Sequence, residues 1–541
     1  MEENKRTILA VVLSLVVLIG WSQLSEHMGW TSKPEVQAPV SGDQPIPVPQ
    51  PSSAPAPAGQ QDAAVVSAFT PTEGREVTVE TPLYTAVFHS GGGTLRSFTL
   101  KHYKKTIAPD SPQQRLAGDS SFALAPMGLT VDGAASWVST DWAFEGENLS
   151  LTGAQKGALS FTGMVNGIRV RRELTFDAST YLITETTRLD GSAVPRNVRL
   201  GFKVGSSEMQ AASNYDETRV AWNEGNSIET NNKVDKLAAE GIEERGPFNW
   251  AGIMNNYFMA VVAPEQGGAV SLKARKQGDF WGVNLERSDI PMQPGSEASV
   301  TTYWWYGAKD RTLLDEAPAN LSQAVDLGMF SIIAKPLLYA LVFFHGYVGN
   351  WGVAIILLTF CIRLCFFPLS QKSYKSMEKM KKLQPMMQKL REKHGSDREA
   401  LNREVMQLYK TYGANPASGC LPILVQLPVF FGLYQALLNS LELRHAAFIP
   451  HLPFTDMVWL ADLSAADPLY ISPILMGATM FLQQKMSPPV GEPLQQKIMM
   501  AMPIIFTVMF INFPSGLVIY WFFNNLLSIA QQWLIMRRSS S

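Results

Sequence analysis

One positively charged side chain, Arg363, lies within an otherwise apolar stretch of the chain, residues 347–369. In a helix it would lie about six residues, or ~9 Å, from the C-terminal end of that stretch. Burying a cation at such a depth in a membrane costs on the order of 2.5–3.5 kcal/mol on insertion scales. Arg363 is therefore a candidate for function, and the alternative is that its side chain snorkels to the nearer interface.

Uncharged polar residues accompany Arg363 in the apolar stretches. Thr359 precedes it by one helical turn on the same face. The stretches 421–441 and 516–535 contain the others: Gln426, Gln435, Asn524, Asn525, Gln531 and Gln532. Such groups can hydrogen-bond between helices, or they can line a wet cavity around Arg363. The stretches 469–484 and 498–512 are near or below the usual lower limit of ~17 residues for a span, which favours thinned lipid beside them.

Motifs of enzymes and metal sites are absent from the sequence. It has no P-loop, no nucleophile elbow and no His-Glu-x-x-His, and its seven histidines are scattered. The three cysteines, Cys361, Cys365 and Cys420, lie in or beside apolar stretches, where they are expected as small apolar residues and not as a metal or disulfide framework. A net charge of −2 argues against a general nucleic-acid binder. We expect no catalytic residue, no metal and no cofactor.

The elements that position these residues follow a clear order. Residues 1–25 contain an apolar run after Lys5 and Arg6 and are predicted to be a retained transmembrane anchor. Residues 26–66 form a linker rich in Pro and Ala. In 67–325, short β-rich runs separated by turn signals predict an antiparallel sandwich. The runs are 77–80, 84–88, 95–100, 168–176, 181–189, 198–204, 280–285 and 299–305, and the three glycines at 91–93 are expected to form a turn.

The C-terminal part is predicted to be helical and largely embedded in the membrane. Residues 326–346, interrupted by Lys335 and Pro336, are expected to form an amphipathic helix along the interface. The core, 347–538, has five predicted spans, at about 347–370, 421–441, 468–484, 498–512 and 516–535. With the N-terminal anchor they make a polytopic α-helical membrane protein with six transmembrane helices.

Between these spans, residues 371–415 are cationic and predict a cytoplasmic helical hairpin. Its apolar stripe includes Met377, Met380, Leu383 and Met387, which suits adaptable docking, although a charged face that only sets topology remains the alternative. The distribution of charge places Lys381 and Lys485 with both termini in the cytoplasm, and Asp216, Trp281 and Asp456 outside.

Several motifs resemble the YidC/Oxa insertase family. They are 419–428 (GCLPILVQLP), 467–476, 483–488, 513–520 (FPSGLVIY), and Arg363 followed by Phe367, Pro368 and Leu369. The anchor and the large sandwich are similar to the forms found in Gram-negative bacteria, which are located in the inner membrane with the large domain in the periplasm.

The resemblance implies an insertase and membrane chaperone that works without nucleotide hydrolysis. It implies a groove open to cytoplasm and lipid but closed outside, with Arg363 at its centre and Thr359, Gln426 and Asn524 lining it; Tyr520 and Gln435 complete the candidate set. The sandwich would be a mutarotase-like supersandwich without a sugar site. Implied partners are nascent membrane proteins, membrane lipids, SecYEG and SecDF. Docking of ribosomes or the signal recognition pathway has little support, because the chain stops soon after Arg538.

The mechanism expected from these features begins with an acidic or polar segment held transiently by Arg363. An apolar helix then slides into lipid between the spans 421–441 and 498–512, driven by partition at ~0.8 kcal/mol per buried CH₂. Two other functions compete with it. A small-anion secondary transporter would use Arg363 as its anion site but usually shows repeated halves, which this sequence lacks. A carbohydrate enzyme on a membrane stalk would leave the additional spans unexplained.

Overall fold

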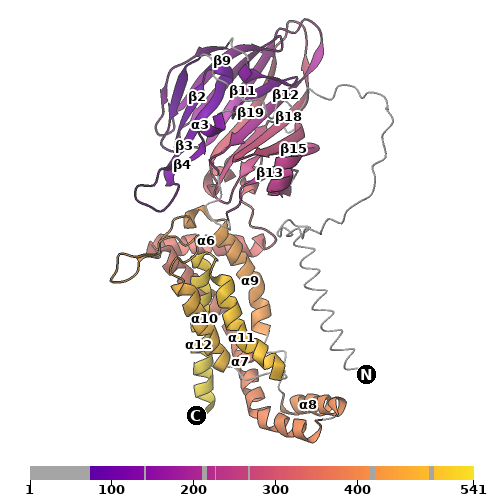
Figure 1. Ribbon diagram of the computed structural model, residues 1–541, viewed down its shortest axis with the longest axis vertical. Coiled ribbons are helices and arrows are strands. Elements are labelled where there is room, and N and C mark those ends of the chain that lie inside the picture. Colours follow the sequence, from indigo (N-terminus) through magenta and orange to yellow (C-terminus); the bar gives the residue numbers. More distant parts are fainter. Residues whose placement is uncertain are drawn as a thin grey trace, which may run out of the picture. The chain divides into compact units, whose positions relative to one another are not determined.

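The computed structural model describes residues 74–540, except 123, 139–141, 210–215, 226, 266–268, 396, 414–420 and 487–492. The predicted anchor at 1–25 and the linker at 26–66 lie outside the described residues. The described chain divides into two compact units, a β domain that ends at Val325 and a helical unit that begins at Asp326. Each unit is described here by itself (Figure 1).

The β domain consists of two sheets. One has five strands in the order β4-β3-β2-β1-β8, and the other has fourteen, of which the main path is β6-β5-β12-β18-β17-β15-β16-β19-β11-β10-β9-β7. Pairing is antiparallel, except for the parallel pair β1–β8. The strands are β1 (Glu76–Glu80), β2 (Tyr84–His89), β3 (Thr94–Lys104), β4 (Gln113–Ala117), β5 (Leu129–Val131), β6 (Ala134–Ala135), β7 (Trp142–Glu145), β8 (Leu149–Ser150), β9 (Lys156–Val165), β10 (Ile168–Asp177), β11 (Leu182–Asp190), β12 (Arg196–Ser206), β13 (Arg219–Glu224), β14 (Ser227–Asn231), β15 (Ile242–Met254), β16 (Phe258–Pro264), β17 (Ala269–Gln277), β18 (Phe280–Met292) and β19 (Ala298–Ala308).

The predicted β-sandwich is confirmed. Each of the eight predicted runs overlaps a strand, namely β1, β2, β3, β10, β11, β12, β18 and β19. Inward residues alternate along β10 and β11, as expected for strands with one buried face. The glycines at 91–93 form a 3-10 turn in which Gly92 has φ 72° and Gly93 φ 62°, a left-handed conformation that glycine adopts without steric cost.

One buried lysine makes the stability of the β domain depend on pH. Lys203 on β12 is fully buried, with its ammonium 4.8 Å from the centre of the Trp137 ring. The indole face favours the charged ammonium, but burial opposes it and lowers the pKa of Lys203 to about 7. Burial dominates because no part of the side chain reaches solvent.

We therefore expect the β domain to become more stable as the pH rises above about 7. Between that value and the ordinary lysine pKa of about 10.4, the unfolded state binds the proton that the folded state has released, so the free energy of unfolding increases with pH, by up to ~1.4 kcal/mol per unit. Thermal unfolding of the full chain at pH 7 and pH 9 measures this. The Lys203→Met variant should show a weaker dependence of stability on pH than the wild type. An equal change in stability of the two proteins between pH 7 and pH 9 would contradict the role assigned to Lys203.

The helical unit contains seven helices among the described residues. They are α6 (Ser331–Val348), α7 (Trp351–Lys393), α8 (Arg398–Tyr412), α9 (Leu421–Leu438), α10 (Ile471–Met486), α11 (Pro493–Phe510) and α12 (Ser515–Ser540), and the short strands β20 (Ile449–His451) and β21 (Val458–Leu460) lie between α9 and α10. Within this part of the chain, α6 and α7 are long and apolar enough to cross a membrane, and 425–438 and 497–510 are shorter apolar helices.

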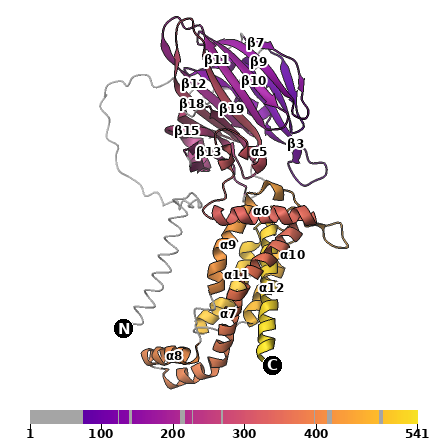
Figure 2. The same ribbon diagram turned by 180° about the vertical axis from the view of Figure 1, so that it is seen from behind.

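Local signals set several of these helix ends. Gly349 ends α6 with φ 64°, and the Asn350 side chain then accepts a hydrogen bond from Val353 N at 3.0 Å, which caps α7. Asp397 caps α8 in the same way, and Gly413 ends it with φ 59°. Helix α6 is continuous across Pro336 and lies across the other helices at one end of the unit (Figures 1 and 2).

Helix α7 differs from the sequence expectation. A span was expected to end near residue 370 and to be followed by a separate hairpin, but α7 runs on to Lys393 through Pro368 and Pro385. The first arm of the hairpin is therefore the same helix as the span. The second arm, α8, folds back against it through Met380, Leu383, Leu408 and Tyr409.

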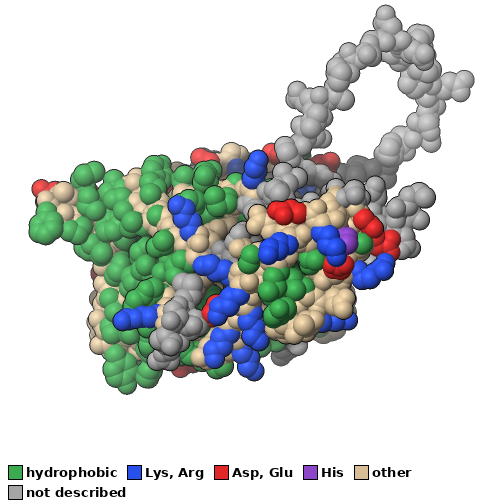
Figure 3. Space-filling view, turned by 90° about the horizontal axis from the view of Figure 1, so that it is seen from below, with side chains coloured by type: hydrophobic (Ala, Val, Ile, Leu, Met, Phe, Trp, Pro, Cys, Tyr) green, Lys and Arg blue, Asp and Glu red, His purple; other side chains and the backbone are tan. Residues whose placement is uncertain are grey.

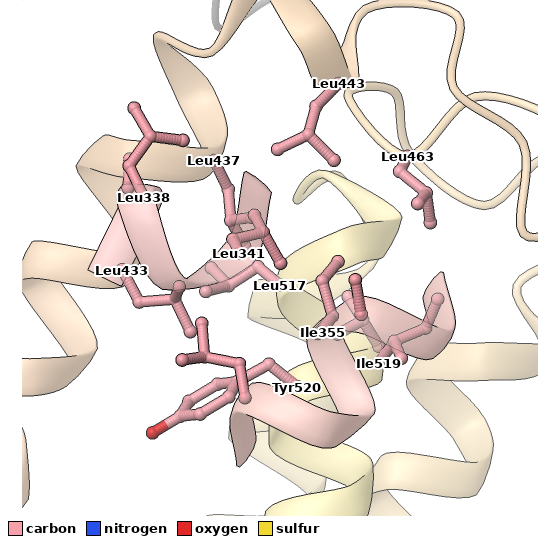
Figure 4. Close-up of a cluster of buried hydrophobic side chains, with 14 of the residues drawn as sticks. Leu338, Leu341, Ile355, Leu433, Leu437, Leu443, Leu463, Leu517, Ile519 and Tyr520 are labelled. Carbon is pink, nitrogen blue, oxygen red and sulfur yellow. The ribbon is translucent and has the colours of Figure 1, made fainter. Parts of the chain in front are cut away.

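The core of the helical unit is formed where α6, α7, α9 and α12 converge (Figure 4). Leu338, Leu341, Ile355, Leu433 and Leu517 are buried at this junction. The side chains of the connection between α9 and α10 join the same core: Leu443, Leu460 and Leu463. Packing at this end therefore holds the helices and this connection together as one body. The polar side chains of α7, α9 and α12 lie farther along the helices, toward the opposite end.

Candidate functional site

Arg363 lies on α7 and is held by α12. Its Nη2 donates a hydrogen bond to Asn524 O at 3.1 Å and another to Ser528 Oγ. The Ser528 hydroxyl in turn donates to Asn524 O at 2.6 Å. The side chain as a whole is partly exposed, whereas its Nε is a buried atom with no hydrogen-bond partner. The Tyr374 side chain of α7 also hydrogen-bonds with Arg363, so the guanidinium is positioned by groups of both α7 and α12.

A second group of polar side chains continues from α12 to α9. Gln426 Nε2 donates to Asn524 Oδ1 at 2.8 Å and to the Tyr520 hydroxyl at 3.1 Å. Asn524 therefore contacts the Arg363 guanidinium through its carbonyl and Gln426 through its side chain. Residues from α7, α9 and α12 form one network, although they are distant in the sequence. We refer to Arg363, Gln426, Tyr520, Asn524 and Ser528 as the polar network.

The other two candidates lie outside this network. Thr359 is fully buried, and its hydroxyl donates to Ile355 O of its own helix at 2.7 Å. Gln435 lies on α9 near its other end, where its side-chain oxygen accepts from Asn439 Nδ2 at 3.0 Å. A Cβ added to Gly328 would lie 3.5 Å from the Gln435 amide. The structure thus brings Arg363, Gln426, Tyr520 and Asn524 together and places Thr359 and Gln435 elsewhere.

A hollow opens beside the polar network. It is small, with a volume of about 10 Å³, room for about one water molecule, and is lined by Ile362, Arg363, Phe366, Leu369, Ser370 and Gln426. Arg363 is the charged residue in a lining that is otherwise apolar or uncharged, so the site offers a hydrogen-bonding cation to an acceptor that enters between α7 and α9. Among the described residues no cluster of His, Cys, Asp and Glu could hold a metal ion.

Sequence reasoning missed Ser528 and Ser370. Ser528 lies one turn beyond Asn524 on the same face of α12, a spacing that places it beside the group contacting Arg363. Serine is common in transmembrane helices as a local hydrogen-bonding residue, so its type alone gave no signal. The spacing from Asn524 was the one signal in the sequence that could have identified it.

The connection between α9 and α10 lies at the end of the helical unit opposite α8 (Figure 1). Asp467 accepts from Ser472 N at 2.7 Å and from Trp459 Nε1 at 3.1 Å, so it caps α10 and fixes the connection. Ser515 Oγ donates to Asp462 O, and Gly516 N donates to Leu463 O, both at 3.0 Å. The start of α12 is thereby tied to the same connection.

The α7–α8 hairpin, residues 371–413, presents basic side chains on its surface. Figure 3 shows Lys and Arg side chains gathered on the face seen from below, where α8 lies. Of the candidate docking residues, Met380 and Leu383 are buried against α8, and Met387 Sδ accepts from the Tyr409 hydroxyl at 3.3 Å. Met377 is half-buried outside that contact. The apolar stripe therefore holds the two arms together, and the exposed large apolar side chains described on the hairpin are Met386, Met406 and Tyr412.

We expect Leu383→Asp to open the hairpin, because a carboxylate would replace an apolar side chain that is 3% exposed. The cost of several kcal/mol should raise the rate of protease cleavage within the hairpin by about tenfold or more. Limited proteolysis of the full chain in membranes measures it. Met406→Asp is the matched control, because Met406 is 52% exposed. Equal cleavage of the two variants would show that the stripe does not hold the arms together.

Comparison with known proteins covers nearly the whole chain. Residues 343–541 match the family described as 60Kd inner membrane protein, and residues 76–340 match the YidC periplasmic domain. A protein named membrane protein insertase YidC from Nitratidesulfovibrio vulgaris (strain DSM 19637 / Miyazaki F) is 55% identical, and the alignment covers 99% of this chain and 100% of that protein. The protein of the same name from Lawsonia intracellularis is 54% identical, with 99% and 100% covered.

Among solved structures, one described as an active YidC insertase with the first transmembrane domain resolved matches with a TM-score of 0.36 and 17% identity. The match covers 87% of this chain and 95% of that one. The sequence identities and the two family matches together establish the family that the motifs had predicted. The chain belongs to the YidC family of membrane protein insertases.

Proposed function

We propose that this insertase receives the polar part of an entering membrane protein at the polar network, with Arg363 as the group that contacts it. The observation that carries the proposal is the guanidinium itself: it is held by Asn524 O and Ser528 Oγ of α12, yet Arg363 borders a hollow between α7 and α9. A carboxylate or backbone carbonyl of the entering chain is the complementary group.

The apolar part of the entering chain would leave between α9 and α11. Helix α9 packs chiefly against α6, and α11 chiefly against α10, so the two helices belong to different packed pairs. Trp521 of α12 lies between them, with its ring centre 4.9 Å from that of Phe430 and 5.5 Å from that of Phe510. Both helices expose apolar side chains: Val425 and Leu427 on α9, and Ile504, Ile505 and Val508 on α11. Partition of an entering helix into lipid supplies the drive.

The proposed topology places the α8 end of the helical unit in the cytoplasm and the end with the connection between α9 and α10 outside. Exposed lysines support this orientation, since Lys381 and Lys382 lie on the α7–α8 hairpin and Lys485 on the last turn of α10. The β domain would be periplasmic, and α6 would lie in the outer interface through Ile332, Tyr339, Phe343 and Tyr347. Cooperation with SecYEG and SecDF belongs to the same proposal, by analogy with the family.

Reconstitution tests the function directly. Liposomes that contain only this protein should insert a short single- or double-span substrate, measured as a protease-protected fragment, in the absence of nucleotide. Matched liposomes with heat-unfolded protein control for spontaneous insertion. Uptake of a small anion without insertion would favour the transporter instead.

Cysteine accessibility in intact cells tests the topology, in a chain whose Cys361, Cys365 and Cys420 are replaced. A cysteine at Asp456, which is exposed, should react with an impermeant reagent from outside. A cysteine at Lys381 should react only after lysis. Labelling of position 381 in intact cells would overturn the proposed orientation.

A further inference from the structure

The connection between α9 and α10 carries a projecting apolar tip. We call residues 449–460 the β20–β21 hairpin; its strands pair Ile449 with Leu460 and His451 with Val458. Phe454 at the tip is fully exposed, and Met457 and Val458 are about half exposed. Residues 445–461 contain one formal charge at neutral pH, that of Asp456, together with two histidines. A soluble loop of this length would ordinarily be polar.

The tip is held in its projecting shape. Leu452 N donates to Met457 O at 2.9 Å, and Thr455 N donates to Leu452 O at 3.0 Å. Phe454 has φ 66°, a left-handed conformation that is strained for a bulky aromatic residue. The turn thus fixes Phe454 away from the hairpin, where a relaxed backbone could have folded the ring against its neighbours.

The base of the hairpin is fixed to the helices. Asn350, which joins α6 to α7, donates through Nδ2 to Phe448 O at 3.0 Å. A Cβ at Gly352 would lie 2.2 Å from the Phe448 ring, so the base of the hairpin lies directly on α7. Leu460 is buried in the core of the helical unit. The tip therefore keeps a constant position relative to α6 and α7.

The position of the tip matches the apolar face of α6. Figures 1 and 2 show the connection, in orange, projecting sideways from the helical unit at the level of α6. The exposed side of α6 carries Ile332, Tyr339, Phe343 and Tyr347, and Tyr470 is exposed at the start of α10. Aromatic and apolar side chains at one level of a membrane protein are typical of the lipid interface.

From this arrangement we propose that the tip of the β20–β21 hairpin, with Phe454 and Met457, inserts into the headgroup region of the outer leaflet beside α6. The lipid surface is the occupant because the exposed apolar side chains of the tip lie at the level of α6, whose exposed side is apolar as well. The backbone of the tip also suits insertion into the headgroup region. Pro450 and Pro453 lack N–H groups, and the turn satisfies those of Leu452 and Thr455, so few donors would lose water. The proposal rests on the proposed membrane embedding of the helical unit.

Depth-resolved fluorescence tests the insertion. In the full chain with its native cysteines replaced, an environment-sensitive dye is attached to a cysteine at position 454, 457 or 194. The labelled chain is reconstituted in phosphatidylethanolamine/phosphatidylglycerol liposomes. Quenching of the dye is then measured with aqueous iodide and with lipids that carry a shallow nitroxide. Val194 is an exposed apolar residue of the β domain and is the matched control. We expect iodide quenching at 454 and 457 to be about threefold weaker than at 194, as for a group ~5–10 Å deep, and nitroxide quenching only at 454 and 457.

Two results would overturn the proposal. Iodide quenching at 454 equal to that at 194, without nitroxide quenching, would place the tip in water. Protection that persists in detergent, or that increases with the protein-to-lipid ratio, would identify a protein surface as the occupant. Because the nitroxide lipid is in both leaflets, the nitroxide result does not depend on the orientation of the chain, so failure here is distinguishable from failure of the proposed topology.

Discussion

Arg363→Ala is expected to abolish most insertion of a substrate with an acidic tail. A partly solvated ion pair contributes about 1 kcal/mol, which corresponds to a loss of roughly fivefold in the insertion rate. Arg363→Lys should retain much of the activity. An ammonium also supplies a positive charge with several donors, and the groups that hold the cation, Asn524 O and Ser528 Oγ, remain in place. Insertion into proteoliposomes at matched protein levels measures both variants.

Charge reversal sharpens the same test. Arg363→Glu should block acidic-tailed substrates and be partly rescued when the tail is made basic. The interaction must remain weak for the tail to leave, and a partly solvated ion pair of about 1 kcal/mol meets that need. If Arg363 only snorkels to the interface, the alanine variant removes a cost of membrane insertion and leaves function intact. Wild-type insertion by Arg363→Ala would therefore falsify the proposed role.

The alternation of the strands and the apolar stretches predicted the fold class, because both patterns are local consequences of burial on one face or in lipid. The other strands of the β domain were missed, among them β9, β15, β16 and β17; in β15 and β16 several residues are buried on both faces, so their sequences lack alternation. The continuity of α7 was also missed. The span was predicted to end near residue 370 because the sequence becomes polar and cationic there, but α7 continues through Pro368 and Pro385 and packs against α12 and α8.

The candidate site was partly predictable for a similar reason. A cation in an apolar stretch is conspicuous in any sequence, and so are amides in the neighbouring stretches. Which of them meet depends on how α7, α9 and α12 are rotated about their axes, and packing sets that rotation. Gln426 and Gln435 are indistinguishable by type and stretch, yet only Gln426 reaches Asn524. Ser528 required the helix-to-helix contact itself.

Mutation of a buried ion pair in the β domain is expected to have as large an effect as mutation of Arg363. The effect is on the stability of the domain and not on insertion. Arg172 on β10 and Glu185 on β11 are fully buried, with Arg172 Nε 2.6 Å from Glu185 Oε1 and Nη2 2.9 Å from Oε2. The remaining guanidinium groups donate to three carbonyl oxygens, those of Gly92, Gly93 and Met127. Glu185 also accepts from Trp304 Nε1 at 2.8 Å and from Thr187 Oγ1 at 2.8 Å.

This pair links the two sheets of the sandwich. Gly92 and Gly93 lie in the turn between β2 and β3 of the five-stranded sheet, whereas β10 and β11 belong to the larger sheet. Every N–H of the guanidinium has an acceptor, so the buried charge is compensated by hydrogen bonds as well as by the carboxylate. Removing either partner leaves the other charge buried without its counter-charge.

We therefore expect Arg172→Met or Glu185→Leu alone to destabilise the β domain by about 3–5 kcal/mol. Arg169→Ala is the matched control on the same strand, because Arg169 and Asp190 form an exposed pair at 3.9 Å, and its effect should stay below about 1 kcal/mol. Pulse proteolysis of the full chain in detergent across a urea series measures the free energy of unfolding of the β domain. An equal effect of Arg172→Met and Arg169→Ala would show that burial adds nothing to the pair.

The double variant Arg172→Met/Glu185→Leu separates the ion pair from the loss of packing. Two apolar side chains of similar size leave no buried charge, so the double variant should be more stable than the sum of the single effects predicts, by about 1–3 kcal/mol. It should not regain full stability. Gly92 O, Met127 O and Trp304 Nε1 would each lose a hydrogen-bond partner inside the domain. Strict additivity of the two substitutions would mean that Arg172 and Glu185 contribute independently, and that the link between the sheets does not depend on their pairing.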